Sequence, residues 1–404
     1  MLLNQYYAPD EAATAQLLAD VGEGLAAAGD EVIAVSGDRG YADPERRYPS
    51  RETLRGVQVR RVGATGFGRR TVAGRLIDYL TFTFAASWSL GRVRAPDRVL
   101  SLSTPPWIGW LGWLTARAKG AAFVYWEMDV YPDVAIALGV LNPESWRARV
   151  LRSAHRRLLA RADVVVALDE AMADRLRSTV DRPIAVVSNW ADGDVVRPRD
   201  IRGHRLREAW GWADRFVVMY SGNLGRAHEF DTVLDAMEQL RDDPRILFAF
   251  VGDGPRREAV RVEAERRNLA ADFRPYQPRE SLGESLTAAD VHLVTLRDGV
   301  EGTVAPSKLY GILAAGRAAL YVGPAAGETH ELLERSGVGV SLRCGDAEGL
   351  ARAIRAAADG TFDLARAGRD ARRMFEAEFT KRKGLARIRE LLQSAGAPSA
   401  EPRS

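Results

Sequence analysis

Cysteine is almost absent from this 404-residue sequence, with Cys344 as its single representative. An intrachain disulfide and a cysteine-based zinc or iron–sulfur site are therefore excluded. Long apolar runs are missing as well, because Asp78 interrupts Leu76–Leu90 and Trp107–Ala116 is much shorter than the roughly 18 residues that span a bilayer. The chain also turns polar by its fourth residue, without the basic flank and apolar stretch of a secretory signal. We expect neither a transmembrane helix nor a secretory signal.

A strong surplus of one charge is also missing. The chain holds 57 basic and 54 acidic residues, a net charge of +3, which argues against nucleic acid as the partner. Its hydrophobic share of 46% and charged share of 27% are typical of a globular protein. At about 150 residues per domain, the length predicts two or three domains. The single cysteine fits a reducing, cytoplasmic location.

Basic and aromatic residues are concentrated in residues 40–125. This segment has 14 basic and 5 acidic residues, and its aromatic residues include Trp107, Trp110 and Trp113. Such a mixture suits peripheral contact with an anionic membrane at the inner face of the cell, with residues 67–119 as the candidate segment. Burial of the aromatic residues in the core is the alternative. We favour burial, because the three tryptophans have the spacing of one helical face.

Short, valine-rich apolar segments alternate with helical patterns along the chain. This pattern is typical of strands buried on both faces of a parallel sheet, joined by helical crossovers into a doubly wound sheet. The expected strands are Glu31–Ser36, Val57–Val62, Val99–Ser103, Ala121–Trp126, Val164–Leu168, Ile184–Ser188, Phe216–Ser221, Ile246–Val251, Val291–Leu296, Ala318–Val322 and Gly339–Leu342.

Residues 192–203 interrupt this alternation with glycine, proline and charge but no periodicity, which predicts a linker. We therefore expect an α/β protein of two Rossmann-like domains, residues 1–195 and 204–372, with ligands bound at the carboxyl ends of the strands. A long amphipathic helical segment, Leu364–Leu392, follows, and the tail beyond it is expected to fray.

Two expected strands of the second half end in glycine-rich loops, Ser221–Gly225 and Val251–Pro255. Glycine lets the backbone approach a ligand closely, and amides at a helix start favour anions. A simple turn is the commoner explanation of either loop taken alone. Neither loop has the third glycine of a dinucleotide fingerprint, and the chain has no P-loop motif. Hydride transfer and P-loop chemistry are therefore disfavoured.

A third loop runs from Gly299 to a helix that starts near Pro306 and Ser307. Lys308 lies in the first turn of that helix, where the helix dipole disfavours a cation. An exposed lysine is one explanation. We prefer a second, that an anion such as a diphosphate binds to Lys308 and the free amides.

Nine short motifs occur along residues 1–392 in an order typical of one enzyme family. They are Asn4–Asp10, Glu127–Asp133, Ala162–Ala167, Ser188–Asp192, Ser221–Gly225, Val251–Pro255, Tyr276–Pro278, Ala289–Thr295 and Ala305–Gly316. In these motifs the sequence resembles retaining GT-B glycosyltransferases of family 4. It is most similar to the bacterial branch of colanic-acid and O-antigen fucosyl- or N-acetylfucosaminyltransferases.

The resemblance implies a GT-B fold, in which an acceptor domain and a donor domain face each other across a cleft and a C-terminal helix, residues 373–396, packs on the first domain. It implies a UDP- or GDP-linked sugar as donor substrate, no cofactor and no metal ion. The diphosphate would be neutralised by Lys308 and Arg226. The other implied donor-binding residues are Gly222, Asn223, Gly225, His228, Gly252, Gly254, Tyr276, Gln277, Glu301, Thr303, Val304, Ala305 and Ser307.

Two features depart from the family pattern. The family often carries two glutamates eight positions apart around the third loop, whereas this chain has Thr303 and Gly311 there. Glu301 is the candidate replacement. Many relatives also have Arg and Lys in the first donor loop, where this chain has Asn223 and His228.

The expected function is transfer of a sugar, with retention, to a glycan or polyprenyl-diphosphate-linked saccharide in bacterial surface polysaccharide synthesis. Amides and a cation would stabilise the departing diphosphate, which would itself accept the acceptor's proton. Asp129 follows an expected strand of the first half and is a candidate acceptor contact or base, or else a cap of the next turn. The alternatives are a non-catalytic sugar-nucleotide-binding scaffold and a GT-B nucleotide-sugar epimerase.

Overall fold

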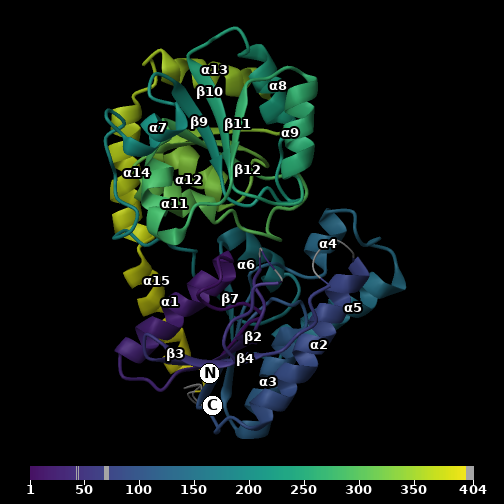
Figure 1. Ribbon diagram of the computed structural model, residues 1–404. Helices are drawn as coiled ribbons and strands as arrows, with labels where there is room; N and C mark the ends of the chain where they lie inside the picture. Colours follow the sequence, from purple (N-terminus) through teal and green to yellow (C-terminus); the bar gives the residue numbers. More distant parts are fainter. Residues whose placement is uncertain (42, 44, 68–71, 397–404) are drawn as a thin grey trace, which may run out of the picture. The chain divides into compact units, whose positions relative to one another are not determined.

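The computed structural model describes residues 1–41, 43, 45–67 and 72–396, which form two compact units (Figure 1). The first unit comprises Met1–Leu168, Met172–Ser188 and the segment from Arg382 onward. The second comprises Asp169–Ala171 and Asn189–Lys381. Each unit is built around its own β-sheet and therefore has its own core.

The first unit contains an eight-stranded sheet that is parallel apart from an antiparallel pair at one edge. In spatial order its strands are β3 (Arg51–Leu54), β4 (Val57–Val62), β2 (Ile33–Gly37), β1 (Leu2–Leu3), β5 (Arg98–Leu102), β6 (Ala122–Trp126), β7 (Val164–Ala167) and β8 (Ile184–Val186). Neither β1 nor β3 is among the expected strands. The first is only two residues long, and the second alternates exposed and half-buried residues at the sheet edge.

Helices surround this first sheet. They are α1 (Ala13–Ala27), α2 (Val72–Gly91), α3 (Ile108–Lys119), α4 (Asp133–Ala137), α5 (Trp146–Leu159), α6 (Glu170–Arg177) and α15 (Lys381–Ser394). Helices α2, α3 and α5 lie side by side (Figure 1). On the other helical layer, Leu385 of α15 packs against Gly24 of α1, so the last helix belongs to the first unit.

Helix α2 is apolar on two opposite faces. Its inner face buries Phe82 and Ala86 against Leu3 and neighbouring core residues. Its outer face presents Phe84, which is 81% exposed, and Trp88, which is 68% exposed. The favoured expectation that the aromatic residues of segment 67–119 are buried is therefore confirmed for Phe82 and wrong for Phe84 and Trp88.

The second unit contains a six-stranded parallel sheet. Its spatial order is β11 (Ala271–Arg274), β10 (Ile246–Val251), β9 (Phe216–Ser221), β12 (Val291–Thr295), β13 (Ala318–Val322) and β14 (Gly339–Leu342). Alternate residues of β9 enter two cores, with Val218 and Tyr220 in one and Val217 and Met219 in the other. Burial on both faces explains the continuous apolar run from which this strand was predicted.

The helices of the second unit carry the chain between these strands. They are α7 (Arg205–Trp210), α8 (Asp231–Gln239), α9 (Arg257–Arg266), the short 3₁₀ helix η1 (Arg279–Ser281), α10 (Leu282–Thr287), α11 (Lys308–Ala314), α12 (Glu328–Ser336), α13 (Ala347–Ala358) and α14 (Leu364–Glu378). None of the helices among the described residues is both long and apolar enough to cross a membrane. The expected α/β fold with two Rossmann-like sheets is confirmed.

The amphipathic segment Leu364–Leu392 is two helices rather than one. Helix α14 ends at Glu378, and α15 starts at Lys381. Between them Phe379 O accepts a hydrogen bond from Ala191 N at 3.4 Å, and Lys381 N donates to Ala191 O at 3.2 Å. These two bonds replace helical hydrogen bonds, because the backbone at the junction pairs with a distant segment.

Candidate functional site

Four neighbouring strands of the second sheet, β11, β10, β9 and β12, end in the loops that the sequence analysis selected. Because these strands are parallel, their carboxyl ends and the following loops lie at one edge of the sheet. The fold therefore brings together Tyr276 and Gln277, the two glycine-rich loops and the loop that leads to α11. Asp129 follows β6 in the other unit.

The two glycine-rich loops are packed directly on each other. Gly222 N donates to Val251 O at 2.8 Å. A side chain on Gly252 would collide with the carbonyl group of Gly222, and one on Gly254 would approach Leu224 O to 2.6 Å. Both glycines also have positive φ angles, 141° and 145°. Gly252 and Gly254 are therefore required for contact between the two loops, whatever their contact with a ligand.

Lys308 lies behind Gly222, whose missing side chain makes room for the lysine stem. Lys308 Nζ is 3.0 Å from His228 Nε2 and 4.9 Å from the centre of the Tyr220 ring. His228 Nδ1 donates to the backbone carbonyl of Thr295 at 2.6 Å. Since Nδ1 carries the hydrogen, Nε2 of the neutral ring is the acceptor for the Lys308 ammonium group.

Burial controls the protonation of this pair. It lowers the pKa of Lys308 to about 7. Burial, followed by the charge of Lys308, lowers the pKa of His228 to about 3, so the imidazole is neutral at physiological pH. Among the described residues no carboxylate forms an ion pair with Lys308. A half-buried ammonium group beside a neutral imidazole and an aromatic ring is an environment in which an anion would favour the charged form of the lysine.

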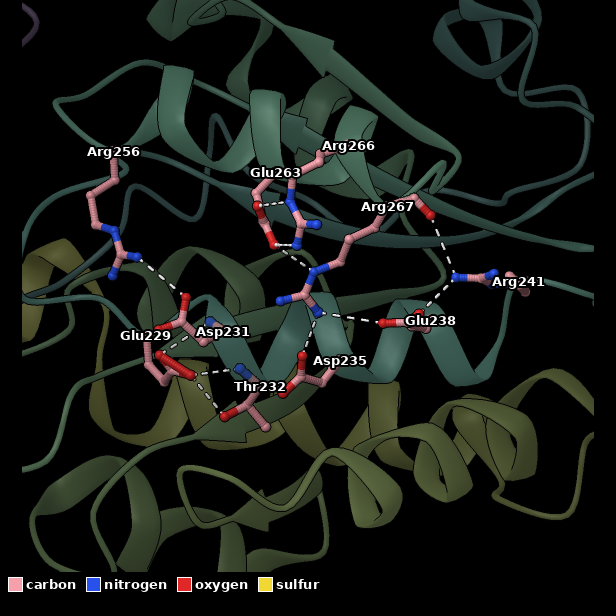
Figure 2. A network of polar contacts seen from close by, with 10 residues as sticks. All are labelled: Glu229, Asp231, Thr232, Asp235, Glu238, Arg241, Arg256, Glu263, Arg266 and Arg267. Atoms are coloured by element: carbon pink, nitrogen blue, oxygen red, sulfur yellow. Dashed lines mark hydrogen bonds and ion pairs between the residues drawn. The ribbon is translucent and has the colours of Figure 1, made fainter.

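Polar contacts surround the start of α8, which follows His228 in the chain (Figure 2). The buried Glu229 carboxylate accepts from the Thr232 backbone N–H at 2.6 Å and from its hydroxyl at 2.8 Å, which caps α8. Arg256 donates to the carbonyl of His228 at 3.2 Å. Farther along, Figure 2 shows Arg267 between α9 and α8. Hydrogen bonds therefore hold both the backbone carbonyl of His228 and the side chain of the residue that follows it.

The side chains of the third loop offer few polar groups for a donor. Thr303 is buried, and its hydroxyl donates to Val300 O at 2.6 Å within the loop itself. Ser307 is exposed, whereas Val304, Ala305 and Glu301 are partly buried. Helix α11 has only seven residues, so its dipole is small and Lys308 is the stronger feature of this loop.

The other selected residues of the second unit differ in their exposure to solvent. Arg226 is exposed, and Gly225 is buried next to Asn223. The Asn223 carbonyl accepts from the Tyr220 hydroxyl at 2.7 Å, which fixes the first loop above β9. Gln277 donates to Pro275 O at 3.0 Å and is partly exposed after β11.

The first unit holds a buried acid–histidine pair that the sequence analysis did not select. Glu127 is fully buried, and its Oε2 lies 2.7 Å from His155 Nε2 on α5. Its Oε1 accepts from the Tyr125 hydroxyl at 3.3 Å. Burial lowers the pKa of His155, but the charge and hydrogen bond of Glu127 outweigh it and the pKa is raised. Residues 127 and 155 are far apart in sequence, so no local spacing signalled the pair.

Asp129 stands next to this pair. Burial and then the charge of Glu127 raise the pKa of Asp129 to about 6. Ser103 Oγ accepts from the backbone N–H groups of Met128 at 3.0 Å and Asp129 at 3.2 Å, so β5 holds the loop after β6. A carboxyl group with a pKa near neutrality can exchange a proton at physiological pH, which suits a general base.

We predict that His155→Phe destabilises the first unit by about 2–3 kcal/mol, because the Glu127 carboxylate remains buried without its partner. The pKa of His155 is higher in the folded state, so its contribution is complete below its unfolded pKa and disappears as the pH rises past the folded value. Thermal unfolding at pH 6 and pH 9 should therefore show a larger loss at pH 6. His155→Gln keeps a donor and is the matched control. Equal losses for both variants would contradict the ion-pair explanation.

The described residues contain no cluster of three or more His, Cys, Asp or Glu side chains that could hold a metal ion. Of the remaining histidines, His292 is fully buried in β12 and donates to Leu286 O at 2.8 Å, a structural role.

Both halves of the chain match glycosyltransferase domain families. Residues 13–190 match the glycosyl transferase 4-like domain, and residues 204–374 match glycosyl transferases group 1. The chain belongs to the GT-B glycosyltransferases. Two bacterial relatives agree with this assignment. The Probable glycosyltransferase WbjE of Pseudomonas aeruginosa is 30% identical over 65% of this chain and 66% of its own length. The Putative colanic acid biosynthesis glycosyl transferase WcaI of Escherichia coli is 27% identical over 70% of this chain and 72% of its own length.

Solved structures show the same GT-B fold. Sucrose-phosphate synthase from Thermosynechococcus elongatus has a TM-score of 0.77 at 19% identity, over 97% of this chain and 98% of that one. Anabaena HepE, solved in complex with UDP-glucose, has a TM-score of 0.71 at 17% identity over the same shares of the two chains. At these identities the likeness supports the fold of this glycosyltransferase and not its substrate.

Proposed function

We propose that this GT-B protein transfers a sugar, with retention, from a UDP- or GDP-linked donor to a glycan or polyprenyl-diphosphate-linked acceptor, without a metal ion. The proposed setting is bacterial surface polysaccharide synthesis in the cytoplasm, in line with the name of the relative WcaI. The observation that carries the proposal is the Lys308–His228 pair, a half-buried ammonium group beside a neutral imidazole at the carboxyl edge of the second sheet. A donor diphosphate has the charge that this site needs.

The mechanism follows from the charges involved. As the bond between sugar and diphosphate breaks, negative charge grows on the departing phosphate oxygen, and Lys308 with nearby backbone amides would stabilise it. Arg226, exposed on the first loop, can add a second positive charge. The departing phosphate would take the proton of the acceptor hydroxyl on the same face of the sugar, which retains its configuration.

Asp129 is proposed to contact the acceptor hydroxyl. Its raised pKa and its fixed loop suit that task, whereas Glu127 is already engaged by His155. Radiolabelled donor separates transfer from the alternatives. A labelled glycoside supports the transferase, a labelled isomeric sugar without glycoside supports the epimerase, and binding without turnover supports the scaffold.

Donor binding should depend on pH through Lys308. The free protein holds the pKa of this lysine at about 7, and a bound diphosphate would raise it. Above pH 7 binding must then take up a proton, so affinity falls by up to about tenfold per pH unit, while below pH 7 it is nearly constant. A panel of UDP- and GDP-sugars can be screened by thermal unfolding, since a ligand at 100 times its Kd adds about 2.7 kcal/mol.

The control for this prediction is Lys308→Met, whose donor affinity should be weak and independent of pH between 6.5 and 9. The matching nucleosides, which lack the diphosphate, should show no pH dependence with either protein. A nucleotide sugar that binds the unaltered protein equally well at pH 6.5 and pH 9 would contradict contact between Lys308 and the diphosphate.

A further inference from the structure

We infer that the outer face of α2, α3 and α5 is a docking surface for an anionic lipid bilayer. Twelve large hydrophobic side chains of the described residues are exposed, and eleven of them lie between Phe67 and Leu151 in the first unit. Such a concentration is unusual for a surface that faces only water. The inference concerns attachment and does not depend on sugar transfer.

The apolar part of this surface is a stripe on α2. Leu80, Phe84 and Trp88 follow one another at four-residue intervals and are 55%, 81% and 68% exposed. The opposite side of the same helix is already packed on the sheet through Phe82 and Ala86. A surface helix in water normally has a polar outer face, so an apolar stripe here calls for a second apolar environment.

Helix α5 extends the surface and adds positive charge. Trp146 is 64% exposed and Val150 is 56% exposed, and both lie on the same helix as five arginines. Helices α3 and α5 together have seven basic residues and no acidic residue. These basic residues are Arg117, Lys119, Arg147, Arg149, Arg152, Arg156 and Arg157. Arg92, just beyond α2, stacks on the Trp88 ring at 3.8 Å. Figure 1 shows α2, α3 and α5 beside one another.

Charge decides between the possible occupants. A second copy of this chain would place two basic surfaces against each other, which is unfavourable. An anionic bilayer offers acidic headgroups for the arginines and an apolar layer for Phe84, Trp88 and Trp146. Exposed aromatic side chains accompanied by basic ones, such as Trp88 with Arg92, are typical of the membrane–water interface. The helices would lie on the bilayer without crossing it.

The test is sedimentation of the full chain with vesicles, without donor or acceptor. Vesicles of phosphatidylcholine with phosphatidylglycerol should bind the protein, and pure phosphatidylcholine vesicles should bind it at least tenfold more weakly. Raising the salt concentration should release it, because screening weakens the arginine contacts. The double variant Phe84→Ser/Trp88→Ser should lower the partition coefficient at least tenfold, with its circular dichroism and melting temperature unchanged or higher.

The matched control is Val262→Ser, which removes an apolar side chain that is 48% exposed on α9 in the second unit. It should bind anionic vesicles like the unaltered protein. Failure of the unaltered protein to bind anionic vesicles would overturn the inference, as would equal binding by the double variant. A lipid-free dimer that the double variant dissociates would instead identify the surface as a contact between copies. Transfer to a water-soluble acceptor can be measured separately, so loss of docking and loss of the proposed function are distinguishable.

Discussion

Replacing Lys308 with alanine is expected to lower sugar transfer at least about tenfold, and by about 10²–10³-fold if the lysine acts mainly on the departing diphosphate. The substitution removes the half-buried ammonium group between His228 and the Tyr220 ring. Because the charge on the diphosphate grows during bond breaking, kcat should fall more than KM rises. Single-turnover measurements with labelled donor give the two quantities separately.

The control is Lys383→Ala, which removes an exposed lysine from α15 and should leave turnover unchanged. Lys308→Arg keeps the charge but needs more room behind Gly222, so it should recover only part of the activity. Lys308→Ala should not destabilise the fold, because burial of the charged ammonium group is unfavourable and the substitution removes that group. Unchanged turnover in Lys308→Ala would remove the lysine from the mechanism.

Replacing Gly252 with alanine is expected to destabilise the second unit by about 3–5 kcal/mol. One part of the cost is the backbone, because a φ of 141° is adopted almost only by glycine. The other is the collision of the new methyl group with the carbonyl of Gly222, where the two loops are joined by hydrogen bonds. Chemical unfolding followed by tryptophan fluorescence measures the decrease in the free energy of unfolding. Displacement of Gly222 should also displace the Lys308 side chain that packs against it.

Gly337→Ala separates the two costs. Gly337 ends α12 with a φ of 66°, and a side chain there would meet no atom within 4 Å. Only the backbone penalty applies, so about 1 kcal/mol is expected. If both glycine variants lost the same stability, the contact between the loops would not be the reason for Gly252.

The sequence predicted the sheet strands well where they are buried on both faces. The bounds of β9, β10 and β13 agree with the expected ranges, because central parallel strands leave continuous apolar runs. It missed β11, whose four residues are all partly buried and include Asp272 and Arg274. The pattern of an edge strand depends on the neighbours that it meets, and these are distant in sequence.

The sequence by itself determined the parallel part of the two sheets, their glycine-rich loops and the order of the motifs that are typical of GT-B glycosyltransferases. These follow from periodicity and short spacings, which act within one element. Tertiary structure alone decided that His228 accepts from Lys308, that Glu127 pairs with His155, and that Phe84 faces outward on α2. Each of these depends on which surfaces the fold covers and which elements it brings together. Burial in the folded chain then lowers the pKa values of Lys308 and His228.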